Sequence, residues 1–163
     1  MSMAELSFPT LLIIMFLMWI GGSPGSTAGG IRTTTFAVAA LNVLSLGKGG
    51  SRIQIFRREI SDESVRRAFA IVVLSVFSLA ISTFLISITD SDKHLLPLAF
   101  ETVSAYSTAG LSLGITPHLS DAGKLILVIT MFMGRVGALT LVITLVKSVQ
   151  NRGYQYPKEE VIF

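Results

Sequence analysis

The chain of 163 residues contains no cysteine, and charged residues make up only 14% of it. Without cysteine there can be no disulfide, no thiolate nucleophile and no cysteine-ligated metal. A soluble domain carries about 25% charged residues, whereas this chain is 51% hydrophobic, with a mean hydropathy of +0.69. The few charges are also separated by long apolar runs. The composition therefore indicates an integral membrane protein, and we expect its fold to be all-α.

The net charge of +3 is concentrated in one segment rather than spread along the chain. Residues 47–67 hold six basic side chains, namely Lys48, Arg52, Arg57, Arg58, Arg66 and Arg67. Basic loops between membrane spans face the cytoplasm, so this pattern favours membrane lipid over nucleic acid as the partner. By the same rule the loop at 89–95 is extracellular and the tail at 150–163 is cytoplasmic. We predict a multi-pass protein of the cell membrane.

A glycine-rich break interrupts the first apolar region, residues 1–46. Ten apolar residues precede the break at 21–30, and a second apolar stretch follows it. The break consists of Gly21, Gly22, Ser23, Pro24, Gly25, Ser26, Thr27, Ala28, Gly29 and Gly30. A helix does not pass readily through five glycines and a proline, and unpaired backbone is not tolerated against lipid. We therefore expect two helical halves, placed end to end, and a loop that is buried in protein or lines a water-filled path.

The second half of the chain, residues 68–149, has the layout of a cation-channel pore module. We predict a span at 68–88, a helix at 97–106 that is too short to cross, a filter segment at 107–112 and a last span at 123–147. The filter would consist of Thr108, Ala109, Gly110 and Leu111. A short helix directs its partly negative end at the pore, and an extended segment after it can offer backbone carbonyls to a dehydrated cation. Gly110 suits the unusual backbone angles that this requires.

Three motifs in this order resemble the Trk/Ktr/HKT potassium transporters. Residues 100–116, FETVSAYSTAGLSLGIT, look like the fourth pore helix and filter of that superfamily, and residues 22–35, GSPGSTAGGIRTTT, look like the broken second helix of its third repeat. Arg135 matches the basic residue in the last helix of the fourth repeat. The resemblance implies a span–pore-helix–span repeat with a broken transmembrane helix before it. The sequence departs from the family pattern at Ala28, where glycine is common, and at Arg32, where lysine is common.

The resemblance also implies a function and a set of partners. Four such repeats surround one potassium pathway, K⁺ is bound at the filter only, and the loop at 21–30 acts as a gate below the filter. The family commonly dimerises, and bacterial members sit on a cytoplasmic ring of nucleotide-binding regulatory subunits. The chain holds the end of the third repeat and all of the fourth. We therefore expect a C-terminal fragment, whether a truncated form, a partial open reading frame or one piece of a split protein, that needs the remainder of the four-repeat pore.

Two charged residues at membrane depth each admit a functional and a structural interpretation. Arg135 is expected to face the pore, where its charge opposes cations and where it can contact the gate loop; the alternative is a structural pairing with helix-end carbonyls. Glu101 is expected to brace the filter by accepting hydrogen bonds from its N–H groups; the alternative is a hydrated position in the outer vestibule. Ser75, Ser78 and Ser82 share one face of the span at 68–88, which predicts a small-residue packing face.

Three other functions compete with potassium transport. The chain could belong to a non-conducting membrane scaffold or regulatory subunit, or to a sodium-selective member of the same family. An intramembrane enzyme would need a buried nucleophile, a carboxylate pair or a metal cluster. The predicted spans contain no Asp, His or Cys, and Glu101 is the single acid at membrane depth. We therefore predict that the protein is not an enzyme.

Overall fold

The computed structural model describes residues 6–47, 54–55 and 58–137, and it is built from helices. Its elements in chain order are α1 (Phe8–Trp19), α2 (Thr33–Gly47), β1 (Gln54–Ile55), β2 (Arg58–Glu59), α3 (Asp62–Thr89), α4 (Leu95–Ser107), the 3₁₀ helix η2 (Thr116–His118) and α5 (Asp121–Val136). The helical class predicted from composition is confirmed. The one departure within the described residues is β1 paired antiparallel with β2, two residues each, inside the predicted basic loop.

Of the described helices, α3 is the one whose length and apolar composition suffice to cross a bilayer. Its 28 residues correspond to about 42 Å. It begins six residues before the predicted span at 68–88, because Ser61 occupies the N-cap position and Asp62 and Glu63 stabilise the positive end of the helix. Residues 138–147 of the predicted span at 123–147, and the tail at 150–163, lie outside the described residues.

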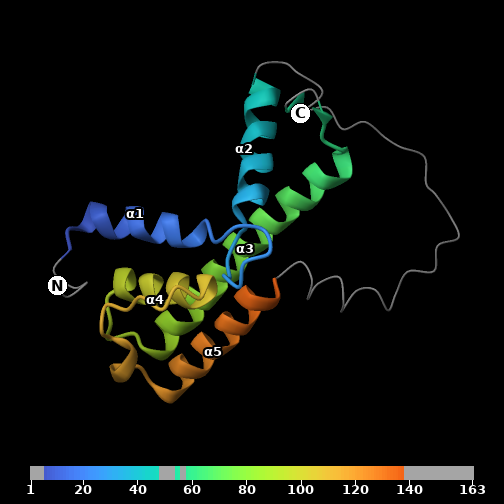
Figure 1. The fold of residues 1–163 in the computed structure, drawn as a ribbon. Helices are drawn as coiled ribbons and strands as arrows, with labels where there is room; N and C mark the ends of the chain where they lie inside the picture. The colour runs from blue at the N-terminus through green and yellow to red at the C-terminus, as the bar shows by residue number, and fades with distance from the viewer. Residues whose placement is uncertain (1–5, 48–53, 56–57, 138–163) are drawn as a thin grey trace, which may run out of the picture.

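The two halves of the predicted broken helix, α1 and α2, are oriented in different directions (Figure 1). They therefore do not stand end to end as expected. The reason lies at the base of the loop, where Ile20 and Ile31 form a parallel bridge. The Gly21 N–H donates to the Ile31 carbonyl at 2.6 Å and the Ile31 N–H to the Trp19 carbonyl at 3.2 Å. These bonds hold the two ends of the loop side by side, and α2 then begins in a different direction from α1.

The short helix α4 is the most enclosed element of the fold and contains the predicted residues 97–106. It packs against α1, α3 and α5. Leu98 and Ala105 on α4 join Ile86 on α3 and Leu127 on α5 in the hydrophobic core. Because α4 is surrounded in this way, its two ends are fixed relative to the long helices, and the segment that follows it starts from a defined position.

The serine face of α3 is buried against neighbouring helices, which confirms the predicted packing role. Ser75, Ser78 and Ser82 are all buried. The Trp19 indole N–H donates to the Ser75 hydroxyl at 3.2 Å, and the Thr130 hydroxyl donates to that of Ser82 at 2.9 Å. The Ser78 hydroxyl donates to the Leu74 carbonyl of its own helix. Small polar side chains thus allow α5 to pack against α3 and let the Trp19 side chain reach it, while every one of the three hydroxyls finds a partner.

The opposite faces of the helices expose large apolar side chains. Examples are Phe16 on α1, Phe77 and Phe84 on α3, and Phe132 on α5, each at least half exposed. Burying such a side chain is worth about 1.5–3 kcal/mol. Faces of this composition are suited to lipid or to further protein rather than to water.

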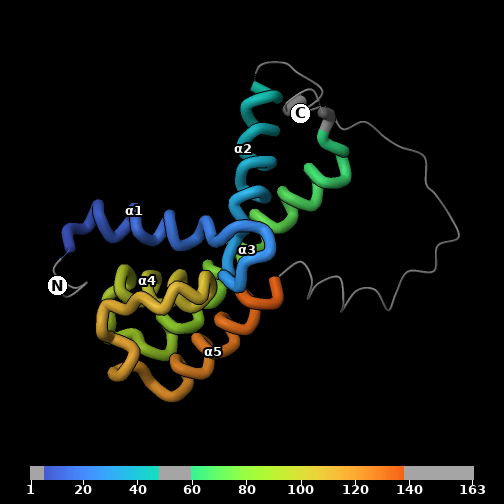
Figure 2. Tube along the Cα trace, viewed as in Figure 1, coloured from blue at the N-terminus to red at the C-terminus, as the bar shows by residue number. Residues whose placement is uncertain are grey.

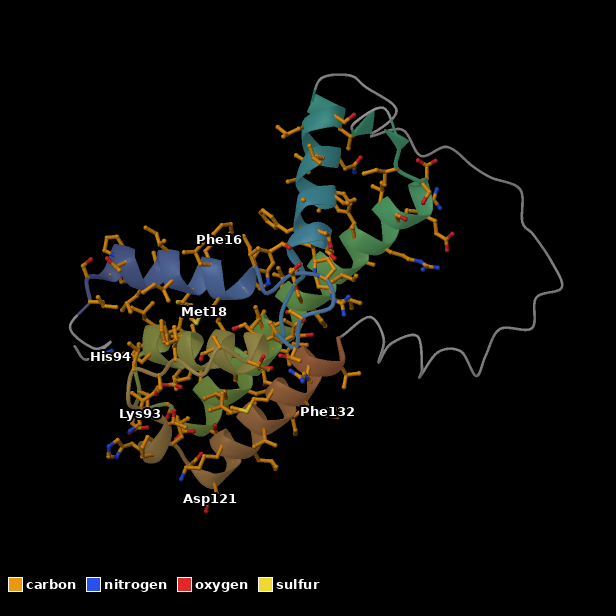
Figure 3. The ribbon with its side chains drawn as sticks, viewed as in Figure 1. Phe16, Met18, Lys93, His94, Asp121 and Phe132 are labelled. Atoms are coloured by element: carbon orange, nitrogen blue, oxygen red, sulfur yellow. The ribbon has the colours of Figure 1, made fainter. Side chains whose placement is uncertain are left out.

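A carboxylate joins α3 to the start of α5 at the end of the fold remote from loop 21–30. Figure 3 shows Lys93, His94 and Asp121 at this end. Asp90 accepts hydrogen bonds from the Ser120 N–H at 2.7 Å and from the Ser120 hydroxyl at 2.8 Å. Burial by itself raises the pKa of Asp90, but these bonds, a bond from the Thr89 hydroxyl and the charge of Lys93 outweigh it and hold the pKa below its ordinary value of 3.8.

Replacing this carboxylate should loosen the junction between α3 and α5. We expect Asp90→Asn to lower the free energy of unfolding by about 1–3 kcal/mol, because the amide leaves at least one Ser120 donor without an acceptor. A depressed pKa stabilises the fold above the unfolded-state value, so the loss in wild type should appear as the pH falls below about 4. Thermal unfolding in detergent measures both the effect of the substitution and the pH dependence of the wild type. Asp92→Asn, at an exposed carboxylate, is the control and should change stability by no more than about 0.5 kcal/mol.

Candidate functional site

The chain leaves α4 through a left-handed turn at the first predicted filter residue. Thr108 has φ 54° and ψ 32°, and Gly110 has φ 75°. The Thr108 N–H donates to the Ala105 carbonyl at 3.2 Å, and the Ala109 N–H donates to the Ser104 carbonyl at 3.0 Å. These two bonds end the helix abruptly. Residues 109–114 then run without regular secondary structure, which leaves their carbonyl groups free of any helix or strand ladder.

Glu101 lies inside α4 and is almost fully buried, with 6% of its surface exposed. One carboxylate oxygen accepts from the Ser112 hydroxyl at 2.5 Å and from the Leu113 N–H at 3.0 Å. The other accepts from the Thr116 hydroxyl at 2.9 Å. The carboxylate thus holds the stretch just after the predicted filter residues 108–111. Of the described N–H groups, the one it binds belongs to Leu113 rather than to residues 108–111.

A cavity of about 370 Å³ lies between this stretch, α4 and α5. Residues from all three parts line it, including Glu101, Thr108, Gly110 and Met131. The described residues contain no group of three or more His, Asp or Glu side chains that could hold a metal ion. Glu101 is the one acidic side chain among the residues that line this cavity, and backbone carbonyl and hydroxyl oxygens are the other groups there that could contact a cation.

Loop 21–30 lies against the end of α4, next to the predicted filter. Gly29 is buried, and its N–H donates to the Thr108 hydroxyl oxygen at 2.9 Å. A Cβ built on Gly29 would stand 2.8 Å from the Tyr106 carbonyl oxygen, closer than real Cβ atoms approach. Gly30, at φ 79°, lies beside Ser107. Two regions that are far apart in the sequence, 21–30 and 107–112, therefore meet in the structure.

The end of α5 covers the same place from the other side. A Cβ built on Gly134 would overlap the Tyr106 carbonyl, so only glycine permits this helix to pass so close to α4. The next residue, Arg135, donates from its guanidinium to the Thr27 carbonyl of loop 21–30. Figure 2 shows the loop beside the end of α5. The loop thus contacts α4 through Gly29 and α5 through Thr27, while residues 23–28 are exposed. The contact expected between Arg135 and the loop is present.

A second, polar cavity of about 350 Å³ borders the loop below this junction. Ala28, Arg32 and Arg135 line it, together with Thr34 and Thr35 near the start of α2. Both arginines bring positive charge to one side of the loop. Arg32 therefore shares a cavity with Arg135, a proximity that the linear sequence does not reveal.

Sequence reasoning missed Gly134 and Thr116 as parts of this site, and it placed Ser112 in the filter segment without its contact to Glu101. A glycine inside a helix destabilises it by about 1 kcal/mol relative to alanine, so a glycine within a predicted span suggests a close packing contact. Gly134, directly before Arg135, was such a glycine. Ser112 and Thr116 carried no comparable signal, because their role depends on the carboxylate of Glu101 reaching them across the turn at Thr108.

The fold and the site together define a class of protein. A helical chain with apolar outer faces, a helix of membrane length, a buried short helix and an irregular loop packed at the end of that helix has the features of a membrane transport protein. Comparison with known proteins identifies the family. The family model described as "Cation transport protein" (TrkH) matches residues 1–154. The chain belongs to this family, whose members are transporters and not enzymes.

Several curated relatives match nearly the whole chain. It is 40% identical over 162 residues to the Ktr system potassium uptake protein D of Bacillus subtilis, covering 99% of this chain and 36% of the relative. Identity to the potassium/sodium uptake protein NtpJ of Enterococcus hirae is 34%, covering 97% and 36%. Identity to the Ktr system potassium uptake protein B of Vibrio alginolyticus is 35%, covering 99% and 35%. The chain therefore spans about a third of the length of these relatives.

The buried carboxylate of Glu101 provides a test of the site. We expect Glu101→Gln to free at least one of its three donors and so to destabilise the stretch at 112–116 by about 1–3 kcal/mol. The unfolding temperature in detergent should fall. Asp92→Asn is the control, since Asp92 is an exposed carboxylate that pairs with Lys93, and it should leave the unfolding temperature nearly unchanged. An unaltered unfolding temperature in Glu101→Gln would contradict the bracing role.

Proposed function

We propose that this chain is part of the pore subunit of a potassium uptake system in the cell membrane. The observation that carries the proposal is the turn after α4, where Thr108 and Gly110 adopt positive φ at the end of a short enclosed helix. Carbonyl groups of residues 108–111 would replace part of the water around a K⁺ ion. The names of the Bacillus and Vibrio relatives, both potassium uptake proteins, support K⁺ as the transported ion.

In this proposal α3, α4 and α5 form a span–pore-helix–span unit, and α1 and α2 are the two parts of a broken helix. Loop 21–30 acts as the gate. Its support is its position: it packs on the end of α4 through Gly29 and Gly30 and is held by the guanidinium of Arg135. Arg135 would then do both things considered for it, facing the pathway with its charge and pairing with a loop carbonyl.

The pathway would need the remainder of a four-repeat pore, because one filter segment cannot surround an ion. Residues 47–67 and the tail at 150–163 would be cytoplasmic, where a ring of nucleotide-binding regulatory subunits would dock on a homodimer. Two relatives are named as proteins of a "Ktr system", and a system of this kind supports the involvement of further components.

One relative supports a variant of this function. NtpJ of Enterococcus hirae is named a potassium/sodium uptake protein. A pathway that also passes Na⁺, or prefers it, is therefore the second candidate. A non-conducting scaffold has no comparable support. Uptake of both ions by the complete protein in cells that lack their own potassium uptake systems distinguishes these functions.

The filter assignment predicts the effect of a single substitution. Gly110→Ser should lower the ratio of K⁺ to Na⁺ uptake by tenfold or more, since φ 75° is unfavourable for serine by about 1–2 kcal/mol. A Cβ at Gly110 would meet no described atom within 4 Å, so the effect would come from the backbone rather than from crowding. Gly47→Ser, also in open space but without positive φ, is the matched control. Unchanged ion ratios in Gly110→Ser would remove the assignment.

The gate assignment predicts the effect of shortening the loop. Deleting residues 23–29 removes Gly29 and the carbonyl that Arg135 contacts, while Ile20 and Ile31 at the base of the loop remain. We expect potassium uptake by the complete protein to rise several-fold, because the segment that covers the end of α4 is gone. Uptake at the wild-type rate, at equal expression, would remove the gating role.

A further inference from the structure

The hydrogen bond between Gly29 and Thr108 joins the proposed gate directly to the first residue of the proposed filter. We propose that Thr108 is a positioning residue whose hydroxyl couples the gate loop to the filter, so that movement of loop 21–30 changes the geometry of residues 108–111. This inference rests on the proposed function, since it gives a physical link between a gate and a filter that were assigned separately.

The loop side of this link has little freedom. Gly29 is buried, so its N–H needs an acceptor, and the Thr108 hydroxyl oxygen at 2.9 Å is the one it has. The Tyr106 carbonyl and the Thr108 methyl group lie so close that even a Cβ on Gly29 would press against both. The loop can therefore leave the end of α4 only by giving up this bond, and while the bond is made the loop stays in place.

The filter side of the link is held in a backbone conformation that threonine rarely adopts. Thr108 is the one non-glycine residue with positive φ in the described part of the chain, and a β-branched side chain disfavours that region. Its conformation is maintained by the helix-ending bonds of Thr108 and Ala109 and by the contact with Gly29. Loss of the Gly29 contact would let Thr108 relax, and the carbonyls that follow it would turn.

Such a link acts in both directions. If loop withdrawal alters the filter, then by thermodynamic reciprocity a filter that is occupied by ions must alter the stability of the closed loop by the same factor. The coupling requires the Thr108 hydroxyl oxygen and a Gly29 N–H within reach of it, and nothing else from either segment. The acceptor on Thr108 and the loop segment that carries the donor can therefore be removed separately.

The test combines two changes in the complete protein and measures potassium uptake. Thr108→Val removes the acceptor at nearly constant volume, and deletion of residues 23–29 removes the donor. We expect Thr108→Val to shift the closed-to-open ratio by about tenfold toward open, the equivalent of one lost hydrogen bond. In the loop-deleted background the same substitution should add nothing. Thr108→Ser, which keeps the hydroxyl, should behave as wild type.

A threonine outside the loop and the filter provides the control. Thr83→Val makes the same chemical change in the apolar groove between α1, α3 and α4 and should leave uptake unaltered. If Thr108→Val changes uptake by the same factor with and without the loop, Thr108 acts on the filter alone and the coupling is overturned while the gate stands. If Thr108→Val has no effect in the intact loop, the coupling is likewise overturned. If loop deletion alone leaves uptake unchanged, the gate itself is wrong, and the coupling falls with it.

Discussion

The close approach of two glycines to the Tyr106 carbonyl, at the C-terminal end of α4, is the contact on which this structure depends. Gly29 comes from loop 21–30 and Gly134 from α5, and a Cβ on either would overlap or crowd that carbonyl oxygen. Because neither position tolerates a side chain, the loop, the short helix and the last helix meet at one point. The turn at Thr108 begins two residues beyond it.

The other end of this arrangement is held by carboxylates. Glu101 binds the stretch at 112–116, and Asp90 binds Ser120 at the start of α5. The segment from Thr108 to Leu111 therefore runs between a fixed helix end and a fixed outer turn, while the loop beneath it is held by single hydrogen bonds from Gly29 and Arg135. In the proposed function, a filter segment that is held at both ends beside a gate loop with few attachments suits selective and regulated ion transport.

Local sequence patterns predicted several features of this fold. The apolar lengths and the glycines at 21–30 indicated two helical halves with a loop between them, and the spacing of Ser75, Ser78 and Ser82 indicated a packed face. Contacts across the fold were out of reach, because they depend on how helices cross. Neither the bridge between Ile20 and Ile31, which turns α2 away from α1, nor the placement of Gly134 on Tyr106 has a signature along the chain. Glu101 was expected to bind N–H groups of the filter, but its partners lie a few residues later, at 112–116. The chain turns at Thr108, and it reaches the carboxylate only after the predicted filter residues 108–111.

The central claim is that loop 21–30 lies on the end of α4 and controls ion passage from there. A Cβ built on Gly30 stands 3.5 Å from the Cβ of Ser107, at the short limit of the range for a disulfide, about 3.5–4.5 Å. The direct measurement is potassium uptake by the complete protein carrying Gly30→Cys and Ser107→Cys, under oxidation and after reduction. The account predicts that the disulfide forms and stops uptake until it is reduced. Full uptake with the cross-link in place would contradict it.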